Sequence, residues 1–332
     1  MGYNKEKIKV DNKMKRIKTI ALWIVVSVVV GLSVFAQFCP ADKWKYYVGL
    51  PKVERKEEGT LRLHFLDVGQ GDCSLIEFPD GKTMLVDGGD GAERTATTIL
   101  RYLNALKIKK IDYLLLTHAD SDHCGGLDTI VEEKEIGLAY IPKVQEDVNT
   151  QYAEFYAAMV EKGYPMQYTE KSAKIPVLDE RYPFTFAFLY PYTSDIENTD
   201  KLKESDNEFS AVFWLDYFGS SALFTGDAPF STENRILEAE ALGVNTHIEL
   251  SDTEILKVAH HGSSGSTSEA FLKYLNAETA MISCAKENLY GHPSDEVCMR
   301  LQEFGVKDYR TYRDGHIIVT MRTDGTYGVE TI

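Results

Sequence analysis

The chain has 332 residues, of which 44% are hydrophobic, 26% charged and 11% aromatic. These values exclude a disordered, collagen-like or repeat-dominated protein and leave room for one large α/β unit with an accessory segment. Residues 60–332 hold 24 Lys and Arg against 45 Asp and Glu, a net charge of −21, whereas residues 1–59 are basic. Such an acidic body repels phosphate backbones at long range, which disfavours a broad nucleic-acid interface. Five cysteines without a C-x-x-C pair indicate neither a disulfide framework nor a thiolate zinc site.

The N-terminal segment predicts one transmembrane helix. Residues 19–41 contain no charged side chain, and about 20 apolar residues in a helix span a hydrocarbon core. Seven Lys and Arg residues precede this stretch, so the positive-inside rule places a basic tail, residues 1–18, in the cytoplasm and the rest of the chain outside. A signal peptide cleaved near Val34-Phe35-Ala36, which would give a secreted protein, is the alternative, but the apolar run is longer than usual for a signal. We therefore expect an uncleaved anchor, a linker at 42–59 and a folded domain at 60–332.

Short apolar β-like runs alternate with helical patterns along the body. In its first half a helix is expected over 99–106, and strands are expected at 61–66, 74–78, 83–86 and 111–116. In its second half strands are expected at 184–189, 211–215, 222–225, 255–258 and 280–283. Ser266 and Glu269 match a capping box ahead of a helix at 270–275, and Ser294 is expected to cap the next helix. Interleaved strands and helices predict a layered α/β fold, with residues 142–208 lacking a clear pattern.

The densest group of potential metal ligands follows the expected strand at 111–116. Residues 117–126 read THADSDHCGG, with four candidate ligands: His118, Asp120, Asp122 and His123. Imidazole and carboxylate groups in a loop between a buried strand and a helix can bind one or two divalent ions. The alternative is a solvated acidic loop, but burying so many ionisable groups beside a hydrophobic strand is costly without a cation.

This loop resembles the H-x-H-x-D-H metal-binding motif of the metallo-β-lactamase-fold hydrolases, with Asp120 in place of the second histidine. Other segments match in the family's order: LDVGQGD at 66–72, LVDGG at 85–89, FTGD at 224–227, KVAHHGS at 257–263 and YGHP at 290–293. Together they resemble the extracytoplasmic domain of ComEC-type DNA-uptake proteins over roughly residues 60–332. The resemblance implies an α/β fold, namely a metallo-β-lactamase-like αββα sandwich, preceded here by the single N-terminal helix.

Carried over position by position, the resemblance implies two neighbouring metal sites. Asp122, His123 and His260 form the first site, and Asp227 bridges it to the second. His260 is preferred to His261 as a ligand because it comes first after the expected strand at 255–258.

The second implied site is richer in oxygen ligands. It takes His118 and Asp120, and Asn207 lies where the family usually has a third histidine. Because an amide oxygen is a harder and weaker ligand than imidazole, this site can hold Mn²⁺ or Mg²⁺ as well as Zn²⁺, or remain partly empty. We therefore expect one or two divalent ions, Zn²⁺ or Mn²⁺, as the cofactor.

Further polar residues of the matching motifs are expected around the ions. His261 and His292 are left to contact or protonate the substrate. Asp87 is expected to orient the metal loop. Asp67 and Asp72 could do the same through hydrogen bonds, although a tight strand connection explains them nearly as well.

The implied reaction is hydrolysis by a metal-activated water, in which Asp122 can be a ligand or a proton acceptor. The leading hypothesis is a membrane-anchored extracytoplasmic phosphodiesterase or DNA nuclease, and its DNA part comes from the resemblance alone. One alternative is an esterase acting on cell-wall phosphodiesters or choline phosphate. Another is a metal-bound module that binds its partner without hydrolysis.

Overall fold

The computed structural model describes residues 3–38, 41–171, 173, 175, 179–197, 207–244 and 248–332. The chain divides into two units, Met1–Gly49 and Leu50–Ile332. The first unit contains the helix α1 (Tyr3–Phe38) and a 3-10 helix (Ala41–Tyr46). Within α1, the segment Lys13–Val34 has a mean hydropathy of 2.3 and no buried residue. Its length and composition are those of a membrane-spanning helix, as the sequence predicts.

The second unit is built on two β-sheets whose inner faces pack together. The first sheet has the strand order β14-β13-β1-β2-β3-β4-β5-β6, and the second has the order β12-β11-β10-β9-β8-β7. The strands of the first sheet are β1 (Leu61–Phe65), β2 (Ser74–Glu77), β3 (Thr83–Val86), β4 (Lys110–Leu115), β5 (Glu135–Ile141), β6 (Met166–Tyr168), β13 (Ile317–Met321) and β14 (Tyr327–Thr331). Those of the second are β7 (Thr185–Tyr190), β8 (Val212–Tyr217), β9 (Ser220–Phe224), β10 (Ile255–Lys257), β11 (Thr279–Ile282) and β12 (Lys307–Arg310).

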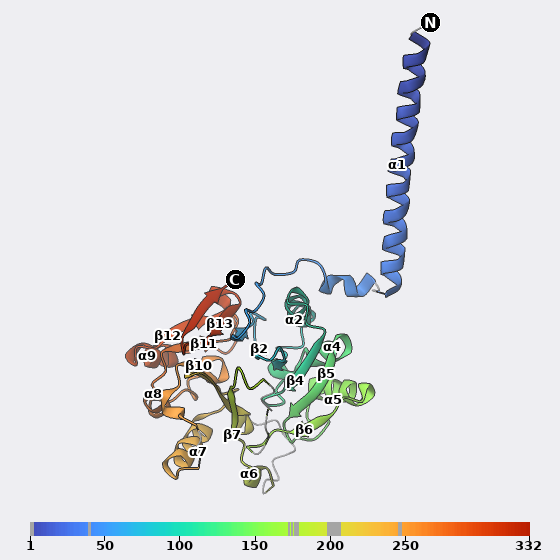
Figure 1. Ribbon diagram of the computed structural model, residues 1–332. Coiled ribbons are helices and arrows are strands. Elements are labelled where there is room, and N and C mark those ends of the chain that lie inside the picture. The colour runs from blue at the N-terminus through green and yellow to red at the C-terminus, as the bar shows by residue number, and fades with distance from the viewer. Residues whose placement is uncertain are drawn as a thin grey trace. The chain divides into compact units, whose positions relative to one another are not determined.

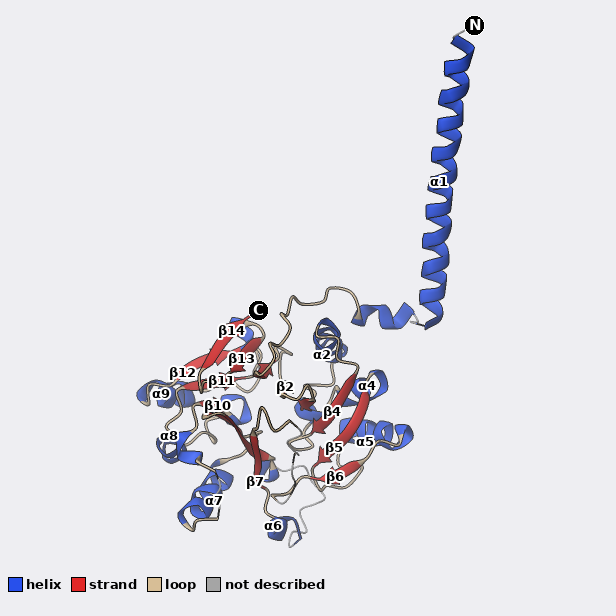
Figure 2. Cartoon of the chain, in the orientation of Figure 1, coloured by secondary structure: helices blue, strands red, loops and turns tan. Residues whose placement is uncertain are grey.

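Helices lie outside both sheets (Figure 1). On the side of β4, β5 and β6 are α2 (Glu93–Ala105), α4 (Leu127–Glu133) and α5 (Thr150–Lys162). On the side of the second sheet are α7 (Phe230–Ala241), α8 (Glu269–Leu275) and α9 (Asp295–Glu303). Shorter helices are α3 (Ser121–Cys124), α6 (Thr193–Glu197) and α10 (Thr311–Asp314). Figure 2 shows the resulting helix–sheet–sheet–helix order, which confirms the predicted αββα sandwich.

Aromatic side chains hold the two sheets together. Phe65 on β1 stacks on Phe224 of β9 with 5.5 Å between ring centroids, and Phe213 of β8 stacks on the same ring at 4.6 Å. All three side chains are buried in one cluster with inward-facing residues of both sheets. Because this core is continuous across the sandwich, it fixes the distance between loops that leave different sheets.

Parallel strand pairs determine where those loops meet. β3 and β4 run parallel in the first sheet, and β9, β10 and β11 run parallel in the second. Parallel neighbours end at the same edge of a sheet, which is where open α/β sheets commonly place their sites. The segments that follow β3, β4, β9 and β10 contain most of the candidate ligands.

Candidate metal centre

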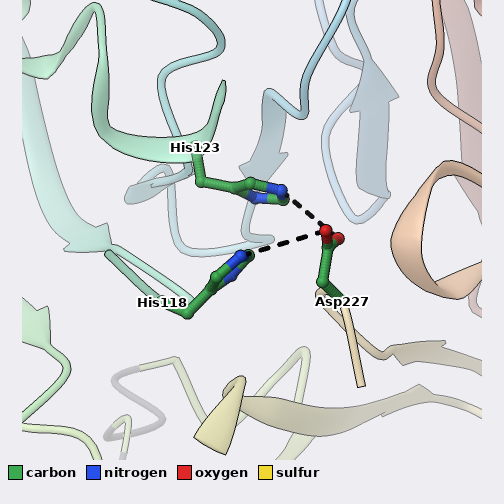
Figure 3. A group of neighbouring side chains, drawn as sticks. All are labelled: His118, His123 and Asp227. Carbon is green, nitrogen blue, oxygen red and sulfur yellow. Dashed lines mark ion pairs between the residues drawn. The ribbon is translucent and has the colours of Figure 1, made fainter. Parts of the chain in front are cut away.

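Asp227 is the point at which side chains from the two sheets meet (Figure 3). His118 and His123 follow β4, and Asp227 follows β9. His123 Nε2 lies 3.2 Å from Asp227 Oδ1, and His118 Nε2 lies 3.9 Å from Asp227 Oδ2. All three residues are at most 2% exposed, so these polar groups are out of contact with bulk water.

A second group of ligand atoms shares His123 with the first. It consists of Asp122, His123 and His261, whose nearest ligand atoms lie within 4.8 Å of one another. His261 Nε2 is 3.2 Å from Asp122 Oδ2 and 3.6 Å from Asp227 Oδ2. The carboxylate of Asp227 therefore lies within 4 Å of histidines from both groups.

The two adjacent histidines after β10 point in different directions. His260 and His261 both have left-handed backbone conformations, with φ of 49° and 54°, which are uncommon for residues other than glycine and tend to occur at functional sites. His261 is buried inside this turn, whereas the His260 side chain is 35% exposed and its Nε2 lies 3.6 Å from Asp227 Oδ2. Among the described residues, His261 rather than His260 joins a group with Asp122 and His123, although chain order had favoured His260.

The chemistry of these groups fits a divalent cation. Within the described part of the chain, the Nε2 atoms of His118, His123 and His261 and the Oδ1 atom of Asp227 are buried and make no well-directed hydrogen bond, although His123 Nε2 and Asp227 Oδ1 lie 3.2 Å apart. Leaving a buried polar atom unpaired costs about 1–3 kcal/mol. Divalent cations that accept these lone pairs would remove this cost, and imidazole with carboxylate is a ligand set typical of Zn²⁺.

Hydrogen bonds at the opposite ring nitrogens fix two of the histidines. Asp87 Oδ2 lies 2.9 Å from His123 Nδ1, and the same carboxylate accepts from the Thr117 hydroxyl and the Thr117 backbone N–H, both at 2.8 Å. His261 Nδ1 lies 2.9 Å from the carbonyl oxygen of Ser283. In each case the acceptor favours a proton on Nδ1 and leaves Nε2 to face the site, an arrangement common at zinc sites.

Asp72 lies behind His261 and forms a buried ion pair. Its Oδ2 is 2.8 Å from Lys257 Nζ and its Oδ1 is 3.5 Å from His261 Nδ1. Its backbone N–H donates to the carbonyl of Asp122 at 3.1 Å. Asp72 thus contacts both sides of the second group, through His261 and through the metal loop.

Asp67 is arranged differently from Asp72. Its Oδ1 accepts from the backbone N–H of Gly69 at 3.3 Å, which closes a local turn, and its own N–H donates to His316 Nδ1 at 3.0 Å. These contacts correspond to the strand-connection alternative that its spacing left open.

The remaining predicted residues lie around the two groups. Asp120 Oδ2 is 3.6 Å from His118 Nε2. Asn207 Nδ2 is 3.3 Å from His260 Nδ1. The rings of His292 and His260 have centroids 5.5 Å apart. Every predicted site residue other than Asp67 therefore contacts the cluster or one of its direct neighbours.

Burial opposes the charged form of the two central histidines, and nearby carboxylates outweigh it. For His123, burial lowers the pKa but Asp227 and Asp87 raise it well above the usual value. For His261, burial is again opposed, mainly by Asp227 and Asp72, and the pKa rises to about 10. The same negative charge that stabilises the protonated rings of His123 and His261 also attracts a divalent cation. Such a cation competes with the protons for the ring nitrogens.

Two residues of this arrangement escaped the sequence analysis. Lys257 is 3% exposed at the end of β10 and pairs with Asp72. Thr117 links the Asp87 carboxylate to the metal loop. A lysine inside an otherwise apolar strand was the available signal, because a buried ammonium requires a partner.

Comparison with known proteins agrees with this geometry. A family model described as the Metallo-beta-lactamase superfamily matches residues 66–286, which include the loops after β3, β4, β9 and β10. The chain belongs to the metallo-beta-lactamase superfamily. Members of this superfamily are generally metal-dependent hydrolases, and its fold binds one or two divalent metals, typically zinc.

Three bacterial proteins are similar to most of this chain. ComE operon protein 3 of Bacillus subtilis (strain 168) is 29% identical over 269 residues, covering 76% of this chain and 32% of that protein. Recombination protein 2 of Haemophilus influenzae is 29% identical over 80% of this chain and 29% of that protein. Competence protein ComA of Neisseria gonorrhoeae is 29% identical over 79% of this chain and 32% of that protein. These matches confirm the predicted resemblance, and the chain spans about a third of the length of these relatives.

Proposed function

We propose that this chain is a metal-dependent phosphodiesterase with two ions in its active site. The observation that carries the proposal is that Asp227 lies within 4 Å of histidines from two groups of potential ligands, each of which contains buried atoms without a hydrogen bond. Two ions held a few ångströms apart can clamp the attacking and leaving oxygens of a phosphodiester, and this is the common use of such pairs in phosphatases and nucleases.

The proposed ligands follow the two groups. Asp122, His123 and His261 would hold one ion, and Asp227 would bridge it to the other. The second ion would be held by His118 and by two residues that the family resemblance assigned to it, Asp120 and Asn207. Relative to the sequence prediction, His261 and His260 exchange roles, because His261 is the one directed into the buried cluster.

When bound, divalent ions supply an activated water and neutralise the charge that develops on the phosphate. The chain's own residues supply position and protons. Ser283 and Asp87 hold the rings of His261 and His123. His260 and His292 lie at the open side of the cluster, where either ring can donate a hydrogen bond to a phosphate oxygen or a proton to the departing alkoxide.

We also propose a location for this reaction. Residues 19–41 would anchor the chain in the membrane, with the basic residues 1–18 in the cytoplasm and the hydrolase domain, residues 60–332, outside. The similarity to competence proteins supports DNA as one phosphodiester among the substrates. The charge of −21 on residues 60–332 favours small phosphodiesters over long polyanions.

A substrate panel tests the proposal on the full chain purified in detergent. Bis-p-nitrophenyl phosphate, single-stranded DNA, phosphocholine esters and p-nitrophenyl acetate are assayed with and without a chelator. We expect chelator-sensitive cleavage of bis-p-nitrophenyl phosphate, and slower cleavage of DNA unless millimolar divalent cation is added. Cleavage of phosphocholine esters alone would support the cell-wall or choline esterase instead. Metal binding without cleavage of any ester would support a non-hydrolytic module.

A further inference from the structure

The segment 285–293 lies beside the active site and is held in a defined conformation. Asn288 Oδ1 accepts hydrogen bonds from the backbone N–H groups of Tyr290 and His292, at 3.2 and 2.9 Å. Asn288 Nδ2 donates to the carbonyl oxygens of Ala285 and His292, at 3.0 and 2.6 Å. One side chain thus satisfies four backbone groups, so the position of the segment is fixed by specific bonds.

This segment presents an exposed aromatic ring next to the cluster. The rings of Tyr290 and His292 are nearly parallel, at an interplanar angle of 17° with centroids 5.8 Å apart. The ring centroid of His292 in turn lies 5.5 Å from that of His260, whose Nε2 is 3.6 Å from Asp227 Oδ2. Tyr290 is 70% exposed although one of its faces lies against His292. The other face is therefore open to solvent, two ring contacts away from His260.

The surroundings of the segment 285–293, of which His292 but not Tyr290 lines the neighbouring cavity, favour a planar group over a strongly charged one. A cavity of about 700 Å³ borders the segment, and its charged lining residues are of both signs: Lys286, Glu287, Asp295 and Arg310. The Arg310 guanidinium is already engaged by Asp308, with Nε 2.6 Å from Oδ2. Leu289, also in the lining, is fully exposed. An exposed apolar and aromatic surface held rigidly beside an active site is typical of a binding site.

We propose that Tyr290 and His292 form a stacking subsite for a planar ring, such as a nucleobase, carried by the substrate near its scissile phosphodiester. The inference rests on the proposed phosphodiesterase function and assigns the substrate a flat, weakly charged group. Stacking on an aromatic side chain tolerates different rings, because each ring has a face to offer. The subsite thus compensates for the missing attraction between an acidic body and a phosphate chain.

Two substrates that differ only in their bases test this subsite by turnover. A thymidine dinucleotide and the same phosphodiester with both bases replaced by hydrogen are compared by kcat/KM on the full chain. We expect Tyr290→Ala to reduce the preference for the dinucleotide about tenfold. Tyr290→Phe keeps the ring and should keep the preference. Tyr168→Ala, which removes another half-exposed tyrosine from β6, is the matched control and should behave as the unmodified protein.

A binding measurement separates this inference from the proposed function. A dinucleotide containing 2-aminopurine and a phosphorothioate link should lose fluorescence on binding, because stacking quenches that base, and Tyr290→Ala should abolish the loss. Quenching that depends on Tyr290 supports the subsite even if no phosphodiester is cleaved, an outcome that would overturn only the proposed function. If Tyr290→Ala cleaves with the same substrate preference and shows the same quenching as the unmodified protein, the subsite is overturned. The proposed phosphodiesterase function is then unaffected.

Discussion

At the scale of single residues, the metal centre depends on which histidine the turn after β10 directs inward. Two consecutive left-handed residues make this turn, and they bury His261 against Asp122 while His260 stays half-exposed beside Asn207. Chain order alone cannot reveal this, because neighbouring residues in a sequence give no sign of the backbone dihedral angles that point one side chain in and the other out.

Replacing each histidine in turn tests the assignment. We expect His261→Ala to lower the content of bound Zn²⁺ or Mn²⁺ by about one ion per chain, since it removes one of three non-bridging ligands of its site. His260→Ala should lower kcat with a smaller loss of metal. Elemental analysis of the purified variants provides the measurement. A larger loss of metal from His260→Ala than from His261→Ala would restore the role that chain order assigned to His260.

The buried pair of Lys257 and Asp72 is a second test at this scale. Removing one partner of a buried ion pair costs about 3–5 kcal/mol, because the other charge is left without compensation. Lys257→Met should therefore lower the free energy of unfolding by about 3 kcal/mol, measured by urea denaturation in the presence of chelator. The double variant Lys257→Met/Asp72→Asn removes both charges and should recover part of the loss. If the double variant loses as much free energy of unfolding as the two single variants lose together, the two charges are not coupled.

At the scale of elements, the connection between β1 and β2 supports the metal loop by close approach. Gly71 has φ of +104°, and a Cβ at this position would lie 2.2 Å from the carbonyl oxygen of Asp122. Gly81, in the next connection, has φ of +86°, and a Cβ there would meet no atom within 4 Å. The two glycines thus share a left-handed backbone and differ in the space around them.

This difference makes Gly81→Ala a matched control for Gly71→Ala. Gly81→Ala should cost only the strain of a left-handed alanine, about 1–2 kcal/mol. Gly71→Ala adds a backbone clash, so it should cost more and also reduce metal content by displacing Asp122. Thermal unfolding and metal analysis of both variants check this. Equal destabilisation by the two substitutions would mean that the connection does not support the loop.

Most strands could be predicted from the sequence because burial on one or both faces leaves an apolar run. The run at 111–116, for example, is β4 (Lys110–Leu115), and the one at 222–225 is β9 (Ser220–Phe224). β5, β6, β12, β13 and β14 were not predicted. β13 pairs with β1 across a long sequence separation, and β14 then pairs with β13; local sequence does not encode such a long-range pairing.

Helix caps were predicted with mixed success. Ser294 caps α9 as expected, accepting from the backbone N–H of Val297. The capping-box prediction for Ser266 is wrong, because Ser268 caps α8 and the Ser266 hydroxyl donates instead to the carbonyl oxygen of Ala259 at 2.8 Å. Several serines near a helix start are equivalent in sequence, and tertiary hydrogen bonds decide among them.

At the scale of the whole molecule, we propose a membrane anchor with the hydrolase domain outside the cell. Seven basic residues precede the uncharged stretch at residues 19–41, and such residues stay on the cytoplasmic side. Protease added to intact cells should therefore cleave the region after the anchor and spare an N-terminal epitope tag. A protected hydrolase domain would reverse the orientation, and a mature protein that starts near residue 37 would indicate signal cleavage.

The central claim is that the cluster around Asp227 hydrolyses phosphodiesters with bound divalent ions. The most direct measurement strips the full chain with chelator and then titrates Zn²⁺ or Mn²⁺ while recording both ions bound per chain and turnover of bis-p-nitrophenyl phosphate. We expect turnover to rise as occupancy approaches two ions per chain, and Asp227→Asn to lose both binding and turnover. Full turnover by the stripped chain, or an Asp227→Asn variant that binds ions and turns over as the unmodified protein does, would contradict this claim.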